Sequence, residues 1–341
     1  MRVLASTTEL FSVASGKAQF RMNCLQLSNG VKIPLIGLGT GGLVSVLSQL
    51  LLKYSTPVEL ENAIRTAIDI GYRHIDTAAM YENEHITGNV LADLIRSGKI
   101  KREELFITSK LPPSSNRPDL VEPTLRATLK DLQTDYVDLY LIHSPTSTMP
   151  SPEGFRMYSG ANQIQKHDHV DLTKTWQAME KVYEKGLAKA IGLSNFNVEQ
   201  IQNIYHAAKV KPHNLQIEVH IYFPQRELHT LCTSLNIAVT AFAPLGCPSR
   251  RGKDGWPEKV AIDNEIVKEL AKKYGKTPAQ ILLRHLLQRQ IVVIPKSTNA
   301  ERLRENFNIF DFEISSDDMN KLNRIEPQGR LYTWSGCGLV V

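Results

Sequence analysis

The chain has 341 residues, of which 42% are hydrophobic and 22% are charged, and its formal net charge is +5. This length allows one large α/β domain or two smaller ones with a substantial buried core. The mild positive charge is not gathered in a long basic run, which argues against nucleic acid as the main partner. No apolar run reaches the roughly 18–20 residues that a membrane-spanning helix needs.

The cysteines and the first 22 residues bear on the cellular compartment. The four cysteines show no C-x-x-C pair and no zinc-type spacing, so we expect a reducing, cytoplasmic location. The stretch Met1–Met22 is basic and contains several serines, with Glu9 as its one acid, a composition that would suit a mitochondrial targeting segment. We favour the simpler interpretation of an unstructured extension or a mis-assigned start.

A β-hairpin is expected at Cys24–Ile33, because two short alternating runs flank Ser-Asn-Gly, a strong turn signal. The glycines that follow, Gly37, Gly39 and Gly42, satisfy the G-x-G-x-x-G pattern, and a helix-like stretch comes next at 43–54. A Rossmann fold would also need an acidic residue at the end of a second strand about 20 residues later. The acids near that distance lie within a helical pattern, so we favour a glycine-rich strand end.

Strand-like and helix-like segments then alternate along the chain. Eight short apolar strands, each followed by amphipathic helical sequence, are typical of a (β/α)8 or TIM barrel, an α/β fold. One domain therefore fits better than two: an extension at 1–22 and a barrel domain at 23–341. The strands are expected near 36–39, 73–77, 105–109, 136–142, 189–193, 214–219, 238–242 and 291–294.

Three long stretches interrupt this alternation: 144–170, 246–261 and the tail from Pro327. The first two are polar and rich in Gly, Pro and Ser. They follow the C-terminal ends of the fourth and seventh expected strands, the face on which barrel active sites lie. We expect these two loops to line the walls of a substrate pocket.

Polar residues at the ends of successive expected strands suggest acid–base chemistry. Asp76, Lys110 and His143 occupy these ends, and Tyr81 follows in the loop after Asp76. Each alone has an ordinary explanation, such as a helix cap or a solvated lysine. Because the C-terminal ends of barrel strands meet at one rim, we expect the four side chains to converge.

The chemistry of these four residues is self-consistent. A phenol with a pKa of about 10 is a poor acid near neutrality. A nearby Lys110 ammonium should lower the pKa of Tyr81, and Asp76 should keep that ammonium charged and oriented. Tyr81 is thus the expected proton donor, while His143 either orients a carbonyl oxygen or assists proton transfer. One histidine and one carboxylate fall short of a usual zinc set, so no metal is expected.

The segments that carry these residues resemble those of the aldo-keto reductases. GYRHIDTAAMYENE, LFITSKL and YVDLYLIHSP look like the three segments of that family's catalytic tetrad, and AKAIGLSNF, LQIEVH, TAFAPLG and VVIPKSTNAERLRENF match further. The resemblance covers roughly 23–330. It implies a monomeric barrel that binds NADPH without a Rossmann domain and reduces aldehydes or ketones to alcohols by hydride transfer.

The same resemblance implies which residues hold the cofactor. Ser194, Asn195 and Gln216 would bind the nicotinamide carboxamide, and Phe242 would stack on the ring. The complete expected set is Thr40, Asp76, Ser194, Asn195, Gln216, Phe242, Ala243, Leu245, Lys296, Ser297, Thr298, Arg302, Glu305 and Asn306.

Physical reasoning supports the last part of that set. A loop after the eighth strand that runs into a helix N-terminus suits an anion. Lys296 and Arg302 would supply the cations for a 2′-phosphate, which predicts NADPH over NADH.

The chain departs from the family pattern at several positions. Gly41, Pro112 and Ser144 stand where many relatives place pocket aromatics, so we expect a wider or more polar pocket. Leu215 replaces a common Asn and Ala243 a frequent Ser, which would remove a cofactor hydrogen bond.

Two alternatives remain at this stage. One is a cofactor-binding structural or regulatory protein on the same barrel without significant turnover; altered loops would favour it. The other is a Rossmann dehydrogenase that uses the three glycines. All four tetrad positions are filled, which favours the reductase.

Overall fold

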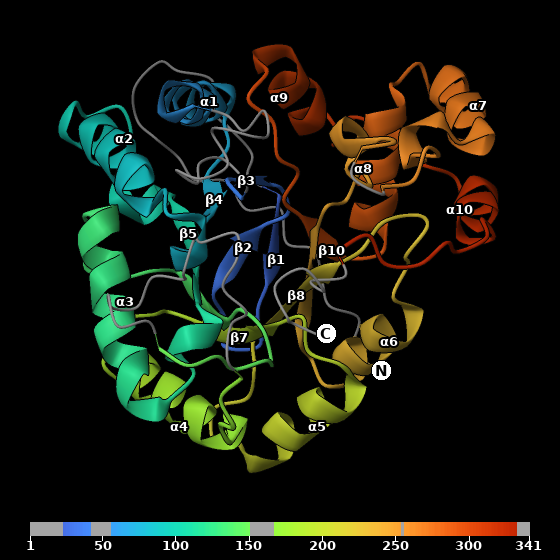
Figure 1. Cartoon of the computed structure of the whole chain (residues 1–341). Helices are drawn as coiled ribbons and strands as arrows, with labels where there is room; N and C mark the ends of the chain where they lie inside the picture. The colour runs from blue at the N-terminus through green and yellow to red at the C-terminus, as the bar shows by residue number, and fades with distance from the viewer. Residues whose placement is uncertain (1–22, 42–55, 151–166, 254–255, 333–341) are drawn as a thin grey trace.

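Eight parallel strands form the centre of the molecule in a computed structural model that describes residues 23–41, 56–150, 167–253 and 256–332. The strands hydrogen-bond in chain order from β3 to β10. A parallel bridge between Ile36 and Val293 joins the two edges, so the barrel is nearly closed. Helices surround it as a ring (Figure 1). The predicted (β/α)8 barrel is confirmed.

Every predicted strand segment overlaps an observed strand. The strands are β3 (Gly37–Gly39), β4 (His74–Asp76), β5 (Phe106–Leu111), β6 (Leu139–Ile142), β7 (Ile191–Ser194), β8 (Asn214–Glu218), β9 (Ala238–Phe242) and β10 (Ile291–Val293). The described helices are α1 (Pro57–Ile70), α2 (Glu84–Arg96), α3 (Pro118–Leu132), α4 (Leu172–Glu184), α5 (Val198–Ala207), α6 (Arg226–Ser234), α7 (Glu265–Tyr274), α8 (Pro278–Gln288), α9 (Ala300–Phe307) and α10 (Ser316–Asn323).

The predicted hairpin is present as β1 (Cys24–Gln26) and β2 (Lys32–Pro34), with Gly30 in the left-handed region at φ 89°. Its apolar side chains Leu25 and Ile33 pack with Phe106 and Ala190, which lie near the N-terminal ends of barrel strands. The hairpin crosses the middle of the ring in Figure 1. It therefore covers the end of the barrel opposite the strand C-termini and leaves that rim to the polar residues.

Helix starts follow the expected capping rules. The Asn197 side chain accepts from the backbone of Gln200, whose side chain accepts from the backbone of Asn197, and Thr277 forms the same capping box with Gln280. Such reciprocal pairs satisfy amide groups that a helix N-terminus leaves unbonded. Asn197 and Thr277 thus fix where α5 and α8 begin.

Some expectations fall outside the described residues. The helix-like stretch 43–54 and most of the long segment 144–170 belong to this group. Gly37 and Gly39 lie in β3 of the barrel, so the Rossmann alternative is wrong. Within the described part of the chain, no helix is long and apolar enough to cross a membrane.

Helices α2 and α3 approach each other closely at Gly88. A Cβ added there would lie 2.7 Å from the backbone Cα of Leu132, which is too close for any real side chain. We expect Gly88→Ala to destabilise the fold by about 1–3 kcal/mol because overpacking outweighs the helix propensity of alanine. Thermal unfolding followed by circular dichroism measures this. His85→Ala, an exposed change on the same helix, is the control; equal midpoints for both variants would contradict the packing argument.

Candidate active site

Lys110 is the centre of the polar cluster at the C-terminal rim. It lies on β5 and is 0% exposed. Its Nζ donates to Asp76 Oδ1 at 2.6 Å and to the Thr77 carbonyl at 2.9 Å, and it lies 3.4 Å from the Tyr81 hydroxyl. One ammonium group thus joins three groups from β4 and the segment that follows it. The predicted convergence of these residues is confirmed.

Asp76 uses both of its carboxylate oxygens. Oδ1 accepts from Lys110, and Oδ2 accepts from Gln216 Nε2 at 2.7 Å. Gln216 lies on β8, so the carboxylate links strands from different parts of the barrel wall. A buried carboxylate held by two donors has little freedom to rotate. Asp76 therefore fixes the orientation of the ammonium group.

The charge state of Lys110 follows from this environment. Burial lowers the pKa of an ammonium group, but the negative charge of Asp76 and the contact with Tyr81 more than offset that effect. The net result is a Lys110 pKa above its ordinary value. Lys110 is therefore positively charged at neutral pH.

Tyr81 ends the short helix η1 (Ala79–Tyr81) and faces both Lys110 and His143. Its ring meets the His143 ring edge-on, with centroids 5.8 Å apart. Burial raises the pKa of Tyr81, and the Lys110 ammonium acts in the opposite direction without cancelling it. Lys110 thus acts in the predicted direction, but the net pKa of Tyr81 lies above its ordinary value, because removal of the phenolate from water outweighs one nearby cation.

His143 directly follows β6 and is 4% exposed. Burial, followed by the positive charge of Lys110, holds its pKa well below the ordinary value. The imidazole is therefore neutral near pH 7 and acts as a hydrogen-bonding group rather than as an acid.

Polar groups on β7 and β8 form a second part of the site. Ser194 and Gln216 pair across these neighbouring strands, and Asn195 follows in the left-handed conformation at φ 64°. Asn195 Nδ2 donates to the His143 carbonyl at 2.9 Å and to Ser194 Oγ at 3.2 Å. Asn195 Oδ1 is buried without a hydrogen-bond partner among the described residues. A free buried acceptor of this kind fits the NH2 group of a carboxamide.

The remaining predicted cofactor residues lie on β3, β9 and around α9. Thr40 Oγ1 donates to the Asp76 carbonyl at 3.0 Å, so this hydroxyl already holds the ends of β3 and β4 together. Phe242 ends β9, and Ala243 follows at φ 49°. The residues around α9 are Lys296, Ser297 and Thr298 after β10, exposed Arg302, Glu305 beside Thr277, and buried Asn306.

Glu218 is a structural residue that the sequence did not reveal. It is 0% exposed and accepts from the backbone amides of Leu331 and Tyr332 at 2.7 and 3.0 Å, which holds the C-terminal segment over the end of β8. Tyr332 in turn meets the Phe242 ring edge-on, with centroids 5.6 Å apart. A tail that crosses the rim to reach Glu218 has no signature in local sequence periodicity.

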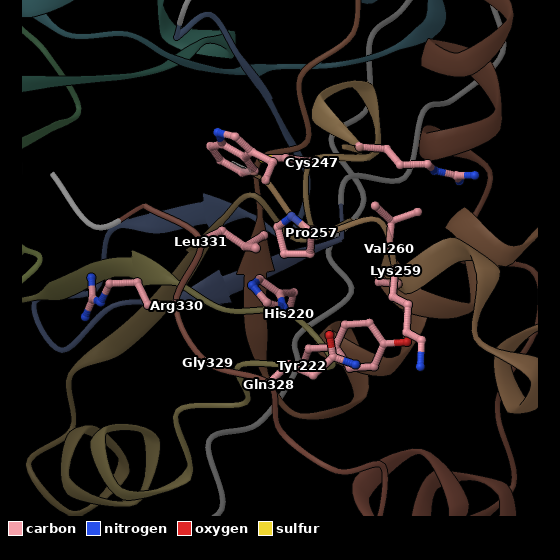
Figure 2. Close-up of a pocket in the computed structure, with 14 residues that line it drawn as sticks. His220, Tyr222, Cys247, Pro257, Lys259, Val260, Gln328, Gly329, Arg330 and Leu331 are labelled. Atoms are coloured by element: carbon pink, nitrogen blue, oxygen red, sulfur yellow. The ribbon is translucent and has the colours of Figure 1, made fainter. Parts of the chain in front are cut away.

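A small cavity lies beneath this segment (Figure 2). It has a volume of about 50 Å³ and lies between the β8 end at His220, the loop from Gly246 and the tail at Gln328–Leu331. Asp76, Lys110 and Tyr81 are not among its lining residues. The cavity is therefore separate from the polar cluster. Its volume suits water rather than an organic substrate.

Comparison with known proteins agrees with this geometry. The model of the aldo/keto reductase family matches residues 35–327. The chain is 43% identical to chicken (Gallus gallus) aldo-keto reductase family 1 member A1 over 305 residues, 89% of each chain. It is 41% identical to the human (Homo sapiens) protein of that name over 309 residues, 90% of each chain. This chain belongs to the aldo/keto reductase family.

Solved structures agree as well. The aldose reductase of Schistosoma japonicum superposes with a TM-score of 0.82 at 40% identity, covering 93% of this chain and 96% of that one. An aldo-keto reductase of Bombyx mori, solved in complex with NADP, gives 0.81 at 37% identity, covering 93% and 97%. The likeness thus includes nearly the whole barrel.

The buried ion pair generates a stability prediction. Asp76→Asn leaves the Lys110 ammonium without its counter-charge, and we expect a loss of about 3–5 kcal/mol at neutral pH. The double change Asp76→Asn with Lys110→Met removes both charges and should recover a large part of that loss. Chemical denaturation of the two variants measures the difference. A double variant that is less stable than Asp76→Asn alone would contradict this account of the pair.

Proposed function

We propose that this protein is an NADPH-dependent reductase of aldehydes or ketones in which Tyr81 donates the proton. The observation that carries the proposal is the arrangement around Lys110. A single buried ammonium contacts both a fixed carboxylate and a phenol at the strand C-termini. Membership of the aldo/keto reductase family supports carbonyl reduction in general.

The cofactor assignment has two supports. The NADP complex of the Bombyx mori relative indicates the type of cofactor. In this chain, the free acceptor on Asn195, together with Ser194 and Gln216, fits a nicotinamide carboxamide. Phe242 is assigned to the nicotinamide ring, and Lys296 and Arg302 to the 2′-phosphate. When bound, NADPH supplies the hydride.

Proton donation follows from the environment of Tyr81. The phenol is protonated at neutral pH, because the ordinary pKa of a tyrosine is about 10 and burial raises it here. As that oxygen gains negative charge, the proton moves from Tyr81, and the nearby Lys110 ammonium stabilises the phenolate that remains. Asp76 keeps the ammonium in place. Hydride and proton together convert the carbonyl to an alcohol.

His143 has a distinct role in this proposal. Because its low pKa keeps the imidazole neutral, it donates a hydrogen bond to the carbonyl oxygen and orients it beside Tyr81. This favours the orienting role over the alternative that His143 transfers the proton itself.

The substrate pocket beside Tyr81 is expected to be open. Gly41 lies next to the tyrosine, and a Cβ added at this position would be 3.1 Å from Tyr81 Cζ. The Tyr81 ring therefore packs against the Gly41 backbone, and an aromatic residue here would crowd the phenol. The wider pocket remains a prediction from Gly41, Pro112 and Ser144.

The central test is Tyr81→Phe. Loss of the hydroxyl removes the proton donor, and we expect kcat to fall by at least about 100-fold while NADPH affinity changes less than about threefold. Steady-state kinetics and fluorescence titration with NADPH measure the two quantities. A Tyr81→Phe enzyme that keeps most of its turnover would exclude Tyr81 as the donor. A wild-type chain that binds NADPH but reduces no carbonyl would instead favour the binding-protein alternative.

A second test concerns cofactor selectivity. Arg302→Ala removes one charge-assisted contact to the 2′-phosphate, so we expect NADPH affinity to fall about 10-fold or more with little change for NADH. Arg304→Ala, an exposed arginine on the same helix, is the matched control. Equal losses for both cofactors in Arg302→Ala would contradict this assignment.

A further inference from the structure

Glu84 is a buried carboxylate that the proposed reaction does not use. It is the first residue of α2, it follows Tyr81 by three positions, and it is 3% exposed. A position at a helix N-terminus favours a negative charge, but removal of a carboxylate from water is costly without compensating contacts. The contacts of Glu84 show what this residue joins.

Two hydroxyl groups hold the Glu84 carboxylate. Ser109 Oγ donates to Oε1 at 2.6 Å, and Thr128 Oγ1 on α3 donates to Oε2 at 2.9 Å. Ser109 directly precedes Lys110 on β5, and successive strand residues point to opposite faces. Glu84 therefore binds the outer face of β5 through Ser109, and the side chain of Lys110 lies on the inner face of the same strand.

Asn83, the residue before Glu84, fixes the same segment to the neighbouring strands. Its Nδ2 donates to the Thr40 carbonyl at 3.1 Å, and its Oδ1 accepts from Thr77 Oγ1 at 3.3 Å. The chain just after Tyr81 is thus attached to β3, β4, β5 and α3. These attachments lie two and three residues after Tyr81, whose hydroxyl is 3.4 Å from Lys110 Nζ.

The negative charge of Glu84 also affects the pKa values of neighbouring tyrosines. Burial raises the Glu84 pKa to about 7, and Asp131 of α3 raises it too, while Ser109, Thr128 and Lys110 act in the opposite direction. In turn, the Glu84 carboxylate contributes to the raised pKa of Tyr81. It likewise raises the pKa of Tyr140, which lies on β6.

We propose that Glu84 is a positioning residue for carbonyl reduction: its hydrogen bonds to Ser109 and Thr128 fix the segment after Tyr81, and so hold Tyr81 relative to Lys110. This inference rests on the proposed role of Tyr81. It adds a second carboxylate, after Asp76, on the helix side of the barrel wall.

Glu84→Gln tests the charge, because the amide has the same size and still hydrogen-bonds both hydroxyls. Above pH 7 the wild-type carboxyl is ionised and raises the Tyr81 pKa, so its removal should lower that pKa. We expect the alkaline limb of the kcat/KM profile to move down by about 0.5 pH unit, with NADPH affinity unchanged within about twofold. A limb at the wild-type pH would show that the Glu84 charge does not act on Tyr81, and a large loss of kcat in Glu84→Gln with both hydrogen bonds kept would contradict the positioning role.

Ser109→Ala tests the link, because it breaks one attachment and keeps the charge. We expect kcat to fall about 3–10-fold while the alkaline limb stays near its wild-type position. Glu84→Asp, with a shorter reach and the same charge, should behave in the same way. Wild-type kcat in both variants would overturn the positioning part.

Two controls separate these effects from misfolding and from failure of the proposed function. Asp131→Asn removes a nearby charge that makes no hydrogen bond to the segment after Tyr81, and it should leave kcat and the alkaline limb unchanged. A loss of kcat equal to that of Ser109→Ala would also overturn the proposal. Because the folded-state Glu84 pKa lies above its ordinary value of 4.5, ionisation weakens the fold as pH rises towards 7. Glu84→Gln should therefore be no less stable than wild type at pH 8.

Failure of the proposed function is a separate outcome. Wild-type turnover in the Tyr81→Phe enzyme would refute the proposed function itself, independently of any Glu84 variant.

Discussion

The ion pair between Lys110 and Asp76 is the interaction on which the site depends. Both groups are almost completely removed from water, and each would be costly to bury alone. Together, with Gln216 and Thr77 filling the remaining hydrogen-bonding positions, they form a fixed charge pair at the strand C-termini. The Tyr81 hydroxyl lies 3.4 Å from the ammonium of this pair, whose positive charge opposes the larger effect of burial on the Tyr81 pKa.

The barrel makes that arrangement possible. Parallel strands in chain order bring residues distant in sequence to one rim, and the hairpin β1–β2 closes the opposite end with apolar side chains. Lys110 and Gln216 lie on strands of the barrel, whereas Tyr81 ends the short helix η1 outside the strands. Hydrogen bonds from the residues that follow Tyr81 attach this segment to the barrel. Glu84 and Asn83 supply them from the helix side. The active rim therefore depends on residues both inside and outside the barrel wall.

The sequence predicted much of this arrangement, for identifiable physical reasons. Strand periodicity and the rule that barrel sites lie at strand C-termini were enough to bring Asp76, Lys110 and His143 together. The balance of pKa effects at Tyr81 could not be predicted, because the extent of burial is a property of the folded molecule. The sequence did not reveal the hydrogen bonds between Glu218 and the C-terminal segment, because they join residues more than 100 positions apart. Roles of the residues around α9 remain predictions.

The most direct test of the account is NADPH oxidation by the wild-type chain at neutral pH with a panel of small aldehydes and ketones, together with NADPH affinity. The account predicts turnover of at least one carbonyl class, with NADPH preferred over NADH. Tight NADPH binding with no oxidation by any carbonyl would contradict the assignment of Tyr81, Lys110 and Asp76 as a working proton-donor system.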